Sequence, residues 1–278
     1  MKLHPKYIQI ETINSCNACC WFCPVKDLKR ERIKMLPSTF SKIIDQLTNH
    51  PPDIIYPFLN GEPFLDNRII TFLHEINEKL PNTRIIIFTN GSLLDESTSI
   101  QLLKIQNLMQ IWFSLNGTNQ DYKQIMGLNY SNTENNIKSL LKLRDELAYP
   151  QEVNISFVGK TSEDATKICN QWKNHHVRLP VSLFFTPIKN FAGLISGHTD
   201  TNRRISSPCA RIYDYLTILA NGDTALCCMD SEGQVNFGNV LDMSIEDIWN
   251  SENRLHYVNM HNEHRWKEVE LCKDCTGA

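Results

Sequence analysis

Apolar residues along the first two thirds of the chain fall into two alternating kinds of segment. Short runs rich in β-branched and aromatic residues predict strands, and longer stretches with apolar residues at helical spacing follow most of them. The predicted strands are residues 7–11, 54–59, 84–89, 109–115, 153–158 and 181–186, and the predicted helices are residues 64–80, 93–106, 132–147 and 162–175. Strands alternating with helices indicate βα units and a parallel sheet. Six such units fit within residues 1–190, whereas an eight-unit barrel takes about 250 residues, so we expect a partial (β/α)6 TIM-like barrel.

The pattern changes after the last predicted barrel strand, and the sequence predicts a second, smaller domain. Residues 191–208 are polar and rich in Gly, Ser, Thr and Asn, which is typical of a linker. Two β-rich runs at residues 215–219 and 224–229 are joined through Asn221-Gly222, a hairpin signal, and a short helix is predicted at residues 244–253. The expected organisation is a barrel at 1–190, a linker at 191–208 and a hairpin-plus-helix domain at 209–278.

Three predicted strands end in the same pair of residues, an asparagine followed by a glycine. The pairs are Asn60-Gly61, Asn90-Gly91 and Asn116-Gly117. A single Asn-Gly pair is most simply a turn signal. Three pairs in equivalent places fall where α/β proteins bind ligands, at the C-terminal ends of parallel strands. We therefore expect a ligand to lie across this edge of the sheet.

Composition narrows the class of protein. The 278 residues are 41% hydrophobic and 21% charged, with a net charge of −3, so neither a nucleic-acid footprint nor a basic membrane-binding face is expected. The N-terminal residues contain no apolar signal segment and no apolar run approaches about 18 residues, which predicts a cytoplasmic protein. Ten cysteines are many for such a protein, and they indicate metal ligands or catalytic groups instead of disulfides.

Cys16, Cys20 and Cys23 follow the first predicted strand with the spacing C-x3-C-x2-C. Three thiolates at this spacing can hold three irons of a cubane [4Fe–4S] cluster and leave the fourth iron open for chemistry. Cys19 allows a second interpretation, in which Cys19, Cys20 and Cys23 form a C-C-x2-C set. A zinc site that uses Cys20, Cys23 and two ligands elsewhere is a third.

The segment from Cys16 to Cys23, with Phe22 before the last cysteine, resembles the signature of the radical S-adenosylmethionine (SAM) superfamily. The resemblance implies that the open iron chelates the amino and carboxylate groups of SAM. It also implies that an electron from the cluster cleaves SAM to methionine and a 5′-deoxyadenosyl radical, which abstracts a hydrogen atom from the substrate. The cofactor then does the difficult chemistry, while the protein positions it and excludes water.

Further segments resemble the SAM-binding parts of this family. Asn60-Gly61-Glu62-Pro63 is similar to the family's Gly-Gly-Glu-Pro segment, which hydrogen-bonds the SAM amino group, although Asn60 replaces the first glycine. Gly61 permits close backbone approach, and Glu62 suits a protonated amine, although a solvated loop carboxylate is the plainer interpretation. The other SAM contacts that the resemblance implies are Thr89, Asn90, Ser114, Asn116 and the backbone of Phe22.

Four cysteines near the C-terminus form a second set: Cys209, Cys227, Cys272 and Cys275. Four thiolates can close a [4Fe–4S] cluster completely, and zinc satisfies the same count. The segment from residue 208 onwards resembles the SPASM extension of radical SAM enzymes in its shortened twitch form. The resemblance implies one auxiliary [4Fe–4S] cluster, because a full SPASM domain needs more cysteines than remain. A cluster with no vacant iron suits electron transfer.

Cys228 is the remaining cysteine with a candidate catalytic role. If Cys228 follows Cys227 on a strand, their side chains face opposite ways, and the Cys228 thiol can return a hydrogen atom to a substrate radical. Core packing or alternate ligation is the plainer interpretation. Asp230 would share the face of Cys228, as a substrate contact or as a cap of the hairpin. Cys169 lies in an apolar helical stretch and is expected in the core.

Together these observations predict a radical SAM oxidoreductase that oxidises a secondary alcohol of a small sugar or aminocyclitol. The auxiliary cluster accepts an electron, and an electron donor such as flavodoxin or ferredoxin is the expected partner. The alternatives are an epimerase with Cys228 as hydrogen donor, a peptide-modifying SPASM-type enzyme and a zinc-stabilised interaction module. The cysteine motif begins by residue 16, which leaves no room before it for a leader-peptide domain and favours a small substrate.

Overall fold

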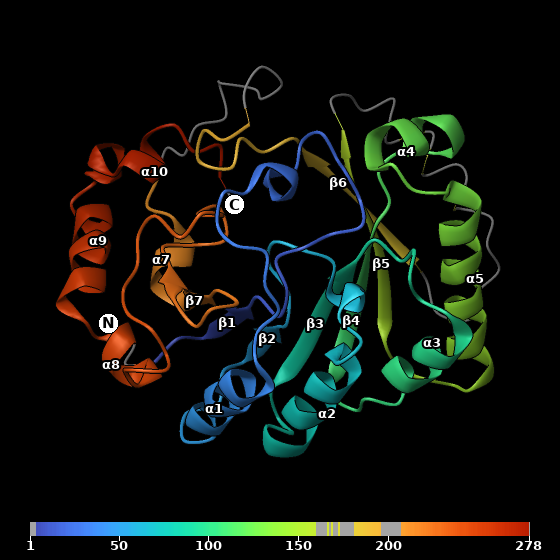
Figure 1. Ribbon diagram of the computed structural model, residues 1–278, viewed down its shortest axis with the longest axis horizontal. Helices are drawn as coiled ribbons and strands as arrows, with labels where there is room; N and C mark the ends of the chain where they lie inside the picture. Colours follow the sequence, from blue (N-terminus) through green and yellow to red (C-terminus); the bar gives the residue numbers. More distant parts are fainter. Residues whose placement is uncertain are drawn as a thin grey trace.

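The computed structural model describes residues 4–159, 181–195 and 207–277, together with Thr166, Ile168 and Trp172. Its centre is an eight-stranded sheet with the order β6-β5-β4-β3-β2-β1-β7-β8 (Figure 1). The strands are β1 Tyr7–Ile10, β2 Ile54–Tyr56, β3 Arg84–Thr89, β4 Leu108–Ser114, β5 Glu152–Gly159, β6 Val181–Pro187, β7 Tyr215–Ile218 and β8 Thr224–Ala225. Cys169, most of the predicted helix 162–175 and most of the predicted linker lie outside the described residues.

Helices and short 3-10 turns connect the strands. The helices are α1 Pro37–Leu47, α2 Ile69–Lys79, α3 Glu96–Leu103, α4 Asn119–Met126, α5 Tyr130–Glu146, α7 Ala210–Asp214, α8 Ile245–Trp249, α9 Glu252–Asn262 and α10 Glu270–Lys273. The 3-10 turns are η1 Pro24–Asp27, η2 Pro63–Leu65 and η4 Trp266–Glu268. Helices α1, α2, α3 and α5 lie around the outside of the sheet, and α8, α9 and α10 gather beside α7 and β7 (Figure 1).

The first six strands run parallel and pair in chain order. This arrangement confirms the predicted parallel sheet of βα units. Strand β2 is shorter than the predicted segment 54–59, because the chain leaves the sheet after Tyr56 to form the loop that carries Gly61 and Glu62. The loops after β1, β2, β3 and β4 follow the C-terminal ends of parallel strands, where the sequence predicts the ligand.

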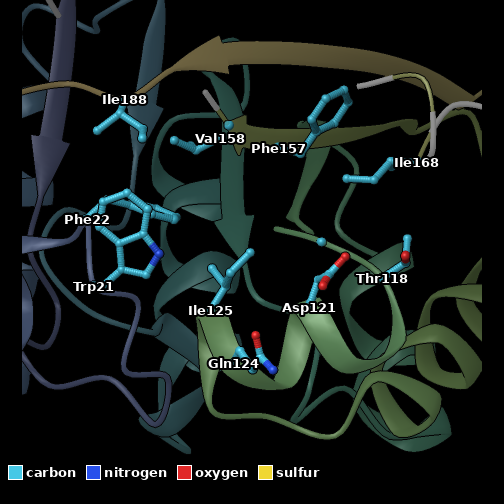
Figure 2. A pocket seen from close by; sticks show the side chains of 12 residues that line it. Trp21, Phe22, Thr118, Asp121, Gln124, Ile125, Phe157, Val158, Ile168 and Ile188 are labelled. Atoms are coloured by element: carbon cyan, nitrogen blue, oxygen red, sulfur yellow. The ribbon is translucent and has the colours of Figure 1, made fainter. Parts of the chain in front are cut away.

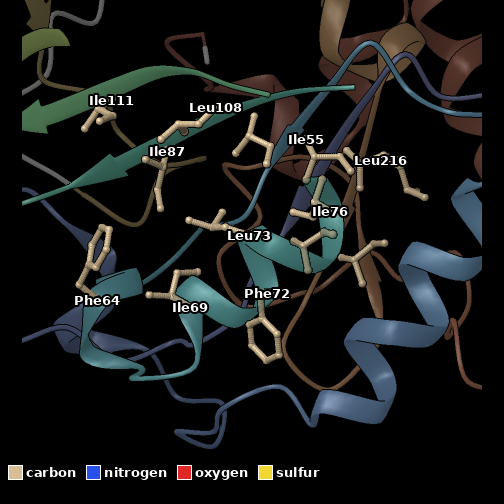
Figure 3. Close-up of a cluster of buried hydrophobic side chains, with 14 of the residues drawn as sticks. Ile55, Phe64, Ile69, Phe72, Leu73, Ile76, Ile87, Leu108, Ile111 and Leu216 are labelled. Carbon is tan, nitrogen blue, oxygen red and sulfur yellow. The ribbon is translucent and has the colours of Figure 1, made fainter. Parts of the chain in front are cut away.

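The core lies between the sheet and the outer helices (Figure 3). Helix α2 buries Phe72, Leu73 and Ile76 against the sheet, where Ile55 of β2 and Ile87 of β3 are also fully buried. Side chains of this size stabilise the fold by about 1.5–3 kcal/mol each when fully buried. Because strand side chains alternate between two faces, the residues next to Ile55 and Ile87 point to the other face, into the barrel.

Some elements differ from the prediction. Helix α1 was not predicted, although Phe40, Ile43, Ile44 and Leu47 are spaced as one buried helical face. Helix α4 was not predicted either, because most of its residues are polar and too few apolar positions mark a helical face. The predicted helix 244–253 is wrong in its length: it divides into α8 and α9, because the Ser251 side chain accepts the Arg254 N–H and starts a new helix.

The predicted hairpin forms, but its first strand belongs to the barrel sheet. Strand β7 pairs in parallel with β1, from Tyr7 opposite Tyr215 to Ile10 opposite Ile218. Strand β8 pairs antiparallel with β7 and ends at Ala225. The C-terminal segment therefore extends the sheet that the first segment begins.

Among the residues that the structure describes, no helix has both the length and the apolar character needed to span a bilayer.

Candidate active site

The first cysteine set lies on the loop between β1 and η1. Asn14 is fully buried at the base of this loop, and its Oδ1 accepts the Ile33 N–H at 2.7 Å. Cys16, Cys20 and Cys23 are partly buried and lie close enough to affect one another's ionisation. The structure thus brings together the three predicted ligands.

The surroundings of these thiols favour a bound cation. Burial raises the pKa of Cys16 to about 11 and that of Cys20 to about 12. A thiolate in such a place is costly unless a positive charge shares the site, and a metal centre supplies that charge. The Ala18 N–H donates to Cys16 Sγ at 3.3 Å, a hydrogen bond that also stabilises a thiolate ligand.

Cys19 contacts the end of α4. Its N–H donates to the Met126 carbonyl at 2.9 Å. Gly127 ends α4 with φ of 71°, and a Cβ there would lie 2.4 Å from Cys19 Sγ. Cys19 packs against this glycine, which supports the C-x3-C-x2-C interpretation over the C-C-x2-C alternative.

Gly61 brings the loop after β2 into backbone contact with the cysteine loop. A Cβ at Gly61 would lie 2.3 Å from the Ile13 carbonyl oxygen and 2.9 Å from that of Ser15, so only glycine fits. The next N–H, of Glu62, donates to the Ser15 carbonyl at 2.9 Å. The predicted close approach at Gly61 is therefore made to the protein's own cysteine loop.

Glu62 is a buried carboxylate and not a solvated one. It is 2% exposed, and it accepts hydrogen bonds from Thr89 Oγ1 at 2.6 Å, from the Asn90 N–H at 2.7 Å and from the Phe64 N–H at 3.1 Å. Burial raises the pKa of Glu62 to about 7, against the opposing effect of these donors. Glu62 and Thr89 thus join the loops after β2 and β3 beside the cysteines.

Asn90 continues this polar network to the cysteine loop. Its Nδ2 donates to Asn17 Oδ1 at 2.8 Å and lies 4.0 Å from Cys16 Sγ. Its Oδ1 accepts from the Ser92 hydroxyl at 2.6 Å. The predicted SAM contacts Glu62, Thr89 and Asn90 are therefore neighbours of one another and of Cys16.

The loop after β4 carries the predicted residue Asn116, which links the ends of two strands. Asn116 is buried, its Oδ1 accepts the Val158 N–H at 2.7 Å, and its amide nitrogen contacts Met126 Sδ at 3.7 Å. These contacts join the ends of β4 and β5. Ser114 is the last residue of β4 and is partly exposed, so both predicted residues lie at the expected edge of the sheet.

A cavity of about 230 Å³ opens at the ends of β5 and β6 (Figure 2). Phe22 and Trp21 form one wall, and Ile125 and Asp121 of α4 face them across the space. Apolar groups dominate the lining, with a few polar groups among them, as is typical of small-molecule sites. The sequence analysis named two of the lining residues, Phe22 as a SAM contact and Gly117 in an Asn-Gly pair. It could not name the others, because the ends of their strands and helices come together only in the folded chain.

The second cysteine set gathers around α7 and α10. Cys209 precedes α7, Cys272 lies on α10, and Cys227 and Cys275 lie close to them. Backbone N–H groups two residues further along donate to Cys227 Sγ at 3.4 Å and to Cys275 Sγ at 3.3 Å. Cys16 has the same arrangement, and such N–H···S bonds are typical of cysteines that ligate clusters.

The strand that the sequence predicts for Cys227 and Cys228 does not form. Strand β8 ends at Ala225, so Cys227 and Cys228 lie in a bend and a turn, and strand alternation does not apply to them. Cys228 instead lies near Arg211, Cys209 and Cys275. It also lines a second cavity, at the opposite face of the sheet from the core.

Asp230 is the reason that the strand ends early. Its buried carboxylate accepts the N–H of Gln234 at 2.8 Å, of Val235 at 3.1 Å and of Leu226 at 3.4 Å. These bonds fold the chain back on itself directly after β8. Asp230 therefore caps the turn, as one of its two predicted roles proposed.

His261 is a site residue that sequence reasoning missed. It is 1% exposed, and its Nδ1 accepts the Cys209 N–H at 3.2 Å. Since Nδ1 is an acceptor, the proton of the neutral ring is on Nε2, which lies 3.7 Å from Cys272 Sγ. Burial lowers the pKa of His261, which keeps the ring neutral. His261 thus contacts two predicted ligands of the second set.

We expect His261→Phe to lower the reduction potential of the second cluster while the cluster is retained. The variant removes an N–H···S bond that stabilises the more negative, reduced state. Redox titration followed by electron paramagnetic resonance measures the potential, and iron analysis measures retention. His256→Phe, an exposed change on the same helix, is the matched control. An unchanged potential in His261→Phe with full iron content would contradict this role.

The second cavity has a volume of about 480 Å³ and is lined by residues from both regions. Asn60 reaches it from the loop beside the first cysteine set. Arg211, Cys228 and Met229 reach it from the second set. A small molecule bound there would contact both parts of the site.

The two regions are also joined by a buried ion pair. Arg30, on the segment after η1, forms two hydrogen bonds with the fully buried Glu11 carboxylate. Arg30 Nε also donates to the Ser231 carbonyl at 2.7 Å. Glu11 in turn accepts the Ala220 N–H at 3.1 Å. Charged pairs of this kind are costly to break from one side, so they hold the cysteine loop against the C-terminal segment.

Comparison with known proteins agrees with this geometry. The pattern described as "Radical SAM superfamily" matches residues 10–165, and the SPASM pattern, described as "Iron-sulfur cluster-binding domain", matches residues 209–276. The "S-adenosyl-L-methionine-dependent 2-deoxy-scyllo-inosamine dehydrogenase" of Niallia circulans is 22% identical over 274 residues, covering 98% of this chain and 92% of that protein.

Solved structures share the fold. BtrN in complex with AdoMet and 2-DOIA has a TM-score of 0.69 at 20% identity, covering 99% of this chain and 94% of that one. Streptococcus suis SuiB bound to the precursor peptide SuiA has a TM-score of 0.68 at 15% identity, covering 92% and 66%. These likenesses confirm the predicted partial barrel with a C-terminal SPASM-type domain.

The family matches also confirm the predicted classes of cofactor. A radical SAM domain binds a [4Fe–4S] cluster and SAM, and a SPASM domain binds further iron–sulfur clusters. The donor sets of this chain, thiols in two groups with N–H···S bonds, fit such clusters. Because the first pattern covers more than half of its length, this chain belongs to the radical SAM superfamily and carries a C-terminal SPASM domain.

Proposed function

We propose that this chain oxidises a secondary alcohol of a small, ring-shaped sugar or cyclitol. The observation that carries the proposal is the second cavity, whose wall includes Asn60 beside the first cysteine set and Cys228 and Met229 beside the second. A substrate there would be within reach of both cofactor sites. The dehydrogenase from Niallia circulans, which aligns with almost the whole chain, supports the same class of reaction.

The cysteines would hold two clusters. Cys16, Cys20 and Cys23 would bind the first and leave a position for SAM, and the second set would bind one auxiliary cluster through the thiols of Cys209, Cys227, Cys272 and Cys275. When bound, these groups supply one-electron chemistry that removes a hydrogen atom and then an electron from the substrate. The protein holds them in place and keeps water away.

The first cavity is the proposed place for the adenosyl part of SAM. Trp21, Phe22 and Ile125 offer apolar surfaces to the adenine ring. Thr118 and Asp121, at the start of α4, offer a hydroxyl and a carboxylate to the ribose hydroxyls. The network of Glu62, Thr89 and Asn90 fixes the neighbouring loops, and the second lone pair of Glu62 Oε2 can accept a bond from the SAM amine.

A second candidate reaction is epimerisation. Cys228 lines the second cavity, so its thiol faces the space where a substrate would bind. Peptide modification is a further alternative, supported by the likeness to SuiB with its precursor peptide. The small second cavity favours a compact substrate over a peptide.

We expect anaerobically reconstituted protein to contain about eight irons per chain, four in each cubane. A Cys16→Ala/Cys20→Ala/Cys23→Ala triple variant should keep about half of them, because the second set is intact. Iron, sulfide and zinc analysis tests this directly. Bound zinc without sulfide in the wild-type protein would refute the proposed cofactor sites.

A further inference from the structure

The second cavity has an aromatic wall. Tyr215, Tyr56, Phe58, Phe88 and Trp112 follow one another, with neighbouring ring centroids 6.1, 6.2, 4.9 and 5.0 Å apart. They come from β7, β2, the loop after β2, β3 and β4, and all line the cavity. These strand residues lie on the face opposite the core residues, so the wall follows from strand alternation. It offers flat, apolar surfaces to a ring-shaped ligand.

Arg211 is the one charged residue among the described residues that line this cavity. It is partly buried on α7, and its guanidinium lies 4.7 Å from the Tyr215 ring centroid. The lining includes no carboxylate within the described part of the chain. Glu152 is exposed and accepts a bond from Gln110 at 2.6 Å, so it is already engaged outside the wall.

The cavity wall also holds an unsatisfied donor. Asn60 is 3% exposed, and its Nδ2 has no hydrogen-bond partner among the residues that the structure places. A buried N–H₂ without a partner is destabilising, and a ligand oxygen that accepts from it would remove that cost. The amide of Gln110, which also lines the cavity, does have a partner, because its oxygen accepts the Trp112 Nε1–H at 2.9 Å.

We infer that the substrate is a compact ring molecule that carries an anionic group, a carboxylate or a phosphate. This inference rests on the proposed function and names the substrate class for it. Arg211 binds the anionic group, which its fork of donors suits. The aromatic wall packs against the apolar face of the ring, and Asn60 donates to a hydroxyl or carbonyl oxygen.

A protonated amine is disfavoured by the same features. It would be buried near Arg211 with no carboxylate in the described lining to pair with, and like charges in a desolvated site are costly. The reaction proposed for this chain would then act on a sugar acid or sugar phosphate, not on an amine such as the one in the relative's name.

Arg211 also has a place beside the second cysteine set, and the test has to separate that structural role from substrate binding. It lies near Cys209, Cys227 and Cys228, so its charge also attracts the thiolates of the second set. A purely structural role would change cluster retention without changing which ligands bind. Binding and iron content therefore have to be measured on the same samples.

The test is isothermal titration of four probes into anaerobic, cluster-loaded protein with SAM and no reductant. D-Glucuronate, D-glucose and D-glucosamine share one ring and differ in charge, and D-glucose 6-phosphate separates phosphate from carboxylate. We expect at least one anionic probe to bind about tenfold tighter than glucosamine. Arg211→Gln should abolish this preference, and Arg211→Lys should keep part of it. Arg265→Gln removes an equal charge from the surface and should leave it intact.

Tightest binding of glucosamine, or an unchanged preference in a cluster-loaded Arg211→Gln variant, would overturn the inference. So would the failure of all four probes to bind at about 10 mM. None of these results tests SAM cleavage. A portion of the same preparation, given a one-electron reductant, should form 5′-deoxyadenosine. Its formation without binding of an anionic probe would count against this substrate class alone, whereas its absence would count against the proposed function.

Discussion

Replacing Cys16, Cys20 and Cys23 together by alanine is expected to reduce 5′-deoxyadenosine formation to background. Each thiolate holds a different iron of the first cubane, so their loss leaves no cluster to deliver an electron to SAM. Reconstituted protein is incubated with SAM and a strong one-electron reductant, and the product is measured by chromatography. The fold should survive, because most of the core lies between the sheet and the outer helices and not in this loop.

Cys19→Ala is the matched control for this experiment. Cys19 is in the same loop, but its sulfur lies against Gly127 at the end of α4, so its loss should leave SAM cleavage largely intact. A triple variant that still produced 5′-deoxyadenosine would show that other residues hold the cluster. A Cys19→Ala variant as inactive as the triple variant would support the C-C-x2-C interpretation instead.

Removing Cys272 and Cys275 is expected to stop product formation while some SAM cleavage survives. A dehydrogenase has to pass an electron from the substrate radical to an acceptor, and the second set holds the proposed acceptor. The double alanine variant is assayed for 5′-deoxyadenosine and for oxidised product in the same reaction. Full product formation without the second cluster would refute its role as electron acceptor.

Cys228→Ala distinguishes oxidation from epimerisation. In a dehydrogenase the variant should cleave SAM and form oxidised product nearly as well as the wild-type protein. In an epimerase it should cleave SAM but lose product, because the thiol hydrogen no longer reaches the substrate radical. Thiol protons exchange with water, so an epimerase also places solvent deuterium at the reacting carbon. Deuterium in a product with no net oxidation would overturn the dehydrogenase proposal.

The sequence was a good guide where the physical signal is local. The predicted strand 84–89 has the bounds of β3, and the motif around Cys16 predicted the family, because both depend on neighbouring residues. The predicted strand 224–229 failed because Asp230 bonds backbone N–H groups on both sides of the turn. Those contacts depend on how the chain folds back, which strand propensity does not describe.

Site residues that depend on distant contacts could not be predicted. His261 meets the Cys209 N–H across 52 residues of sequence, and nothing in its local sequence distinguishes it from a core histidine. Arg211 lies two residues after a predicted ligand, which was a usable signal. Its place in an aromatic cavity nevertheless requires β7 to join β1, and the sequence suggested a separate hairpin domain.

That joining of β7 to β1, with the Arg30 ion pair beside it, constrains how the gene for such a protein can diverge. A C-terminal half taken from a relative would have to supply a strand in register with Tyr7–Ile10. It would also have to present a carbonyl where Ser231 meets Arg30, and an N–H where Ala220 meets Glu11. The two halves are therefore expected to be inherited together, and new substrates to arise by substitution in the cavity wall instead of by exchange of domains.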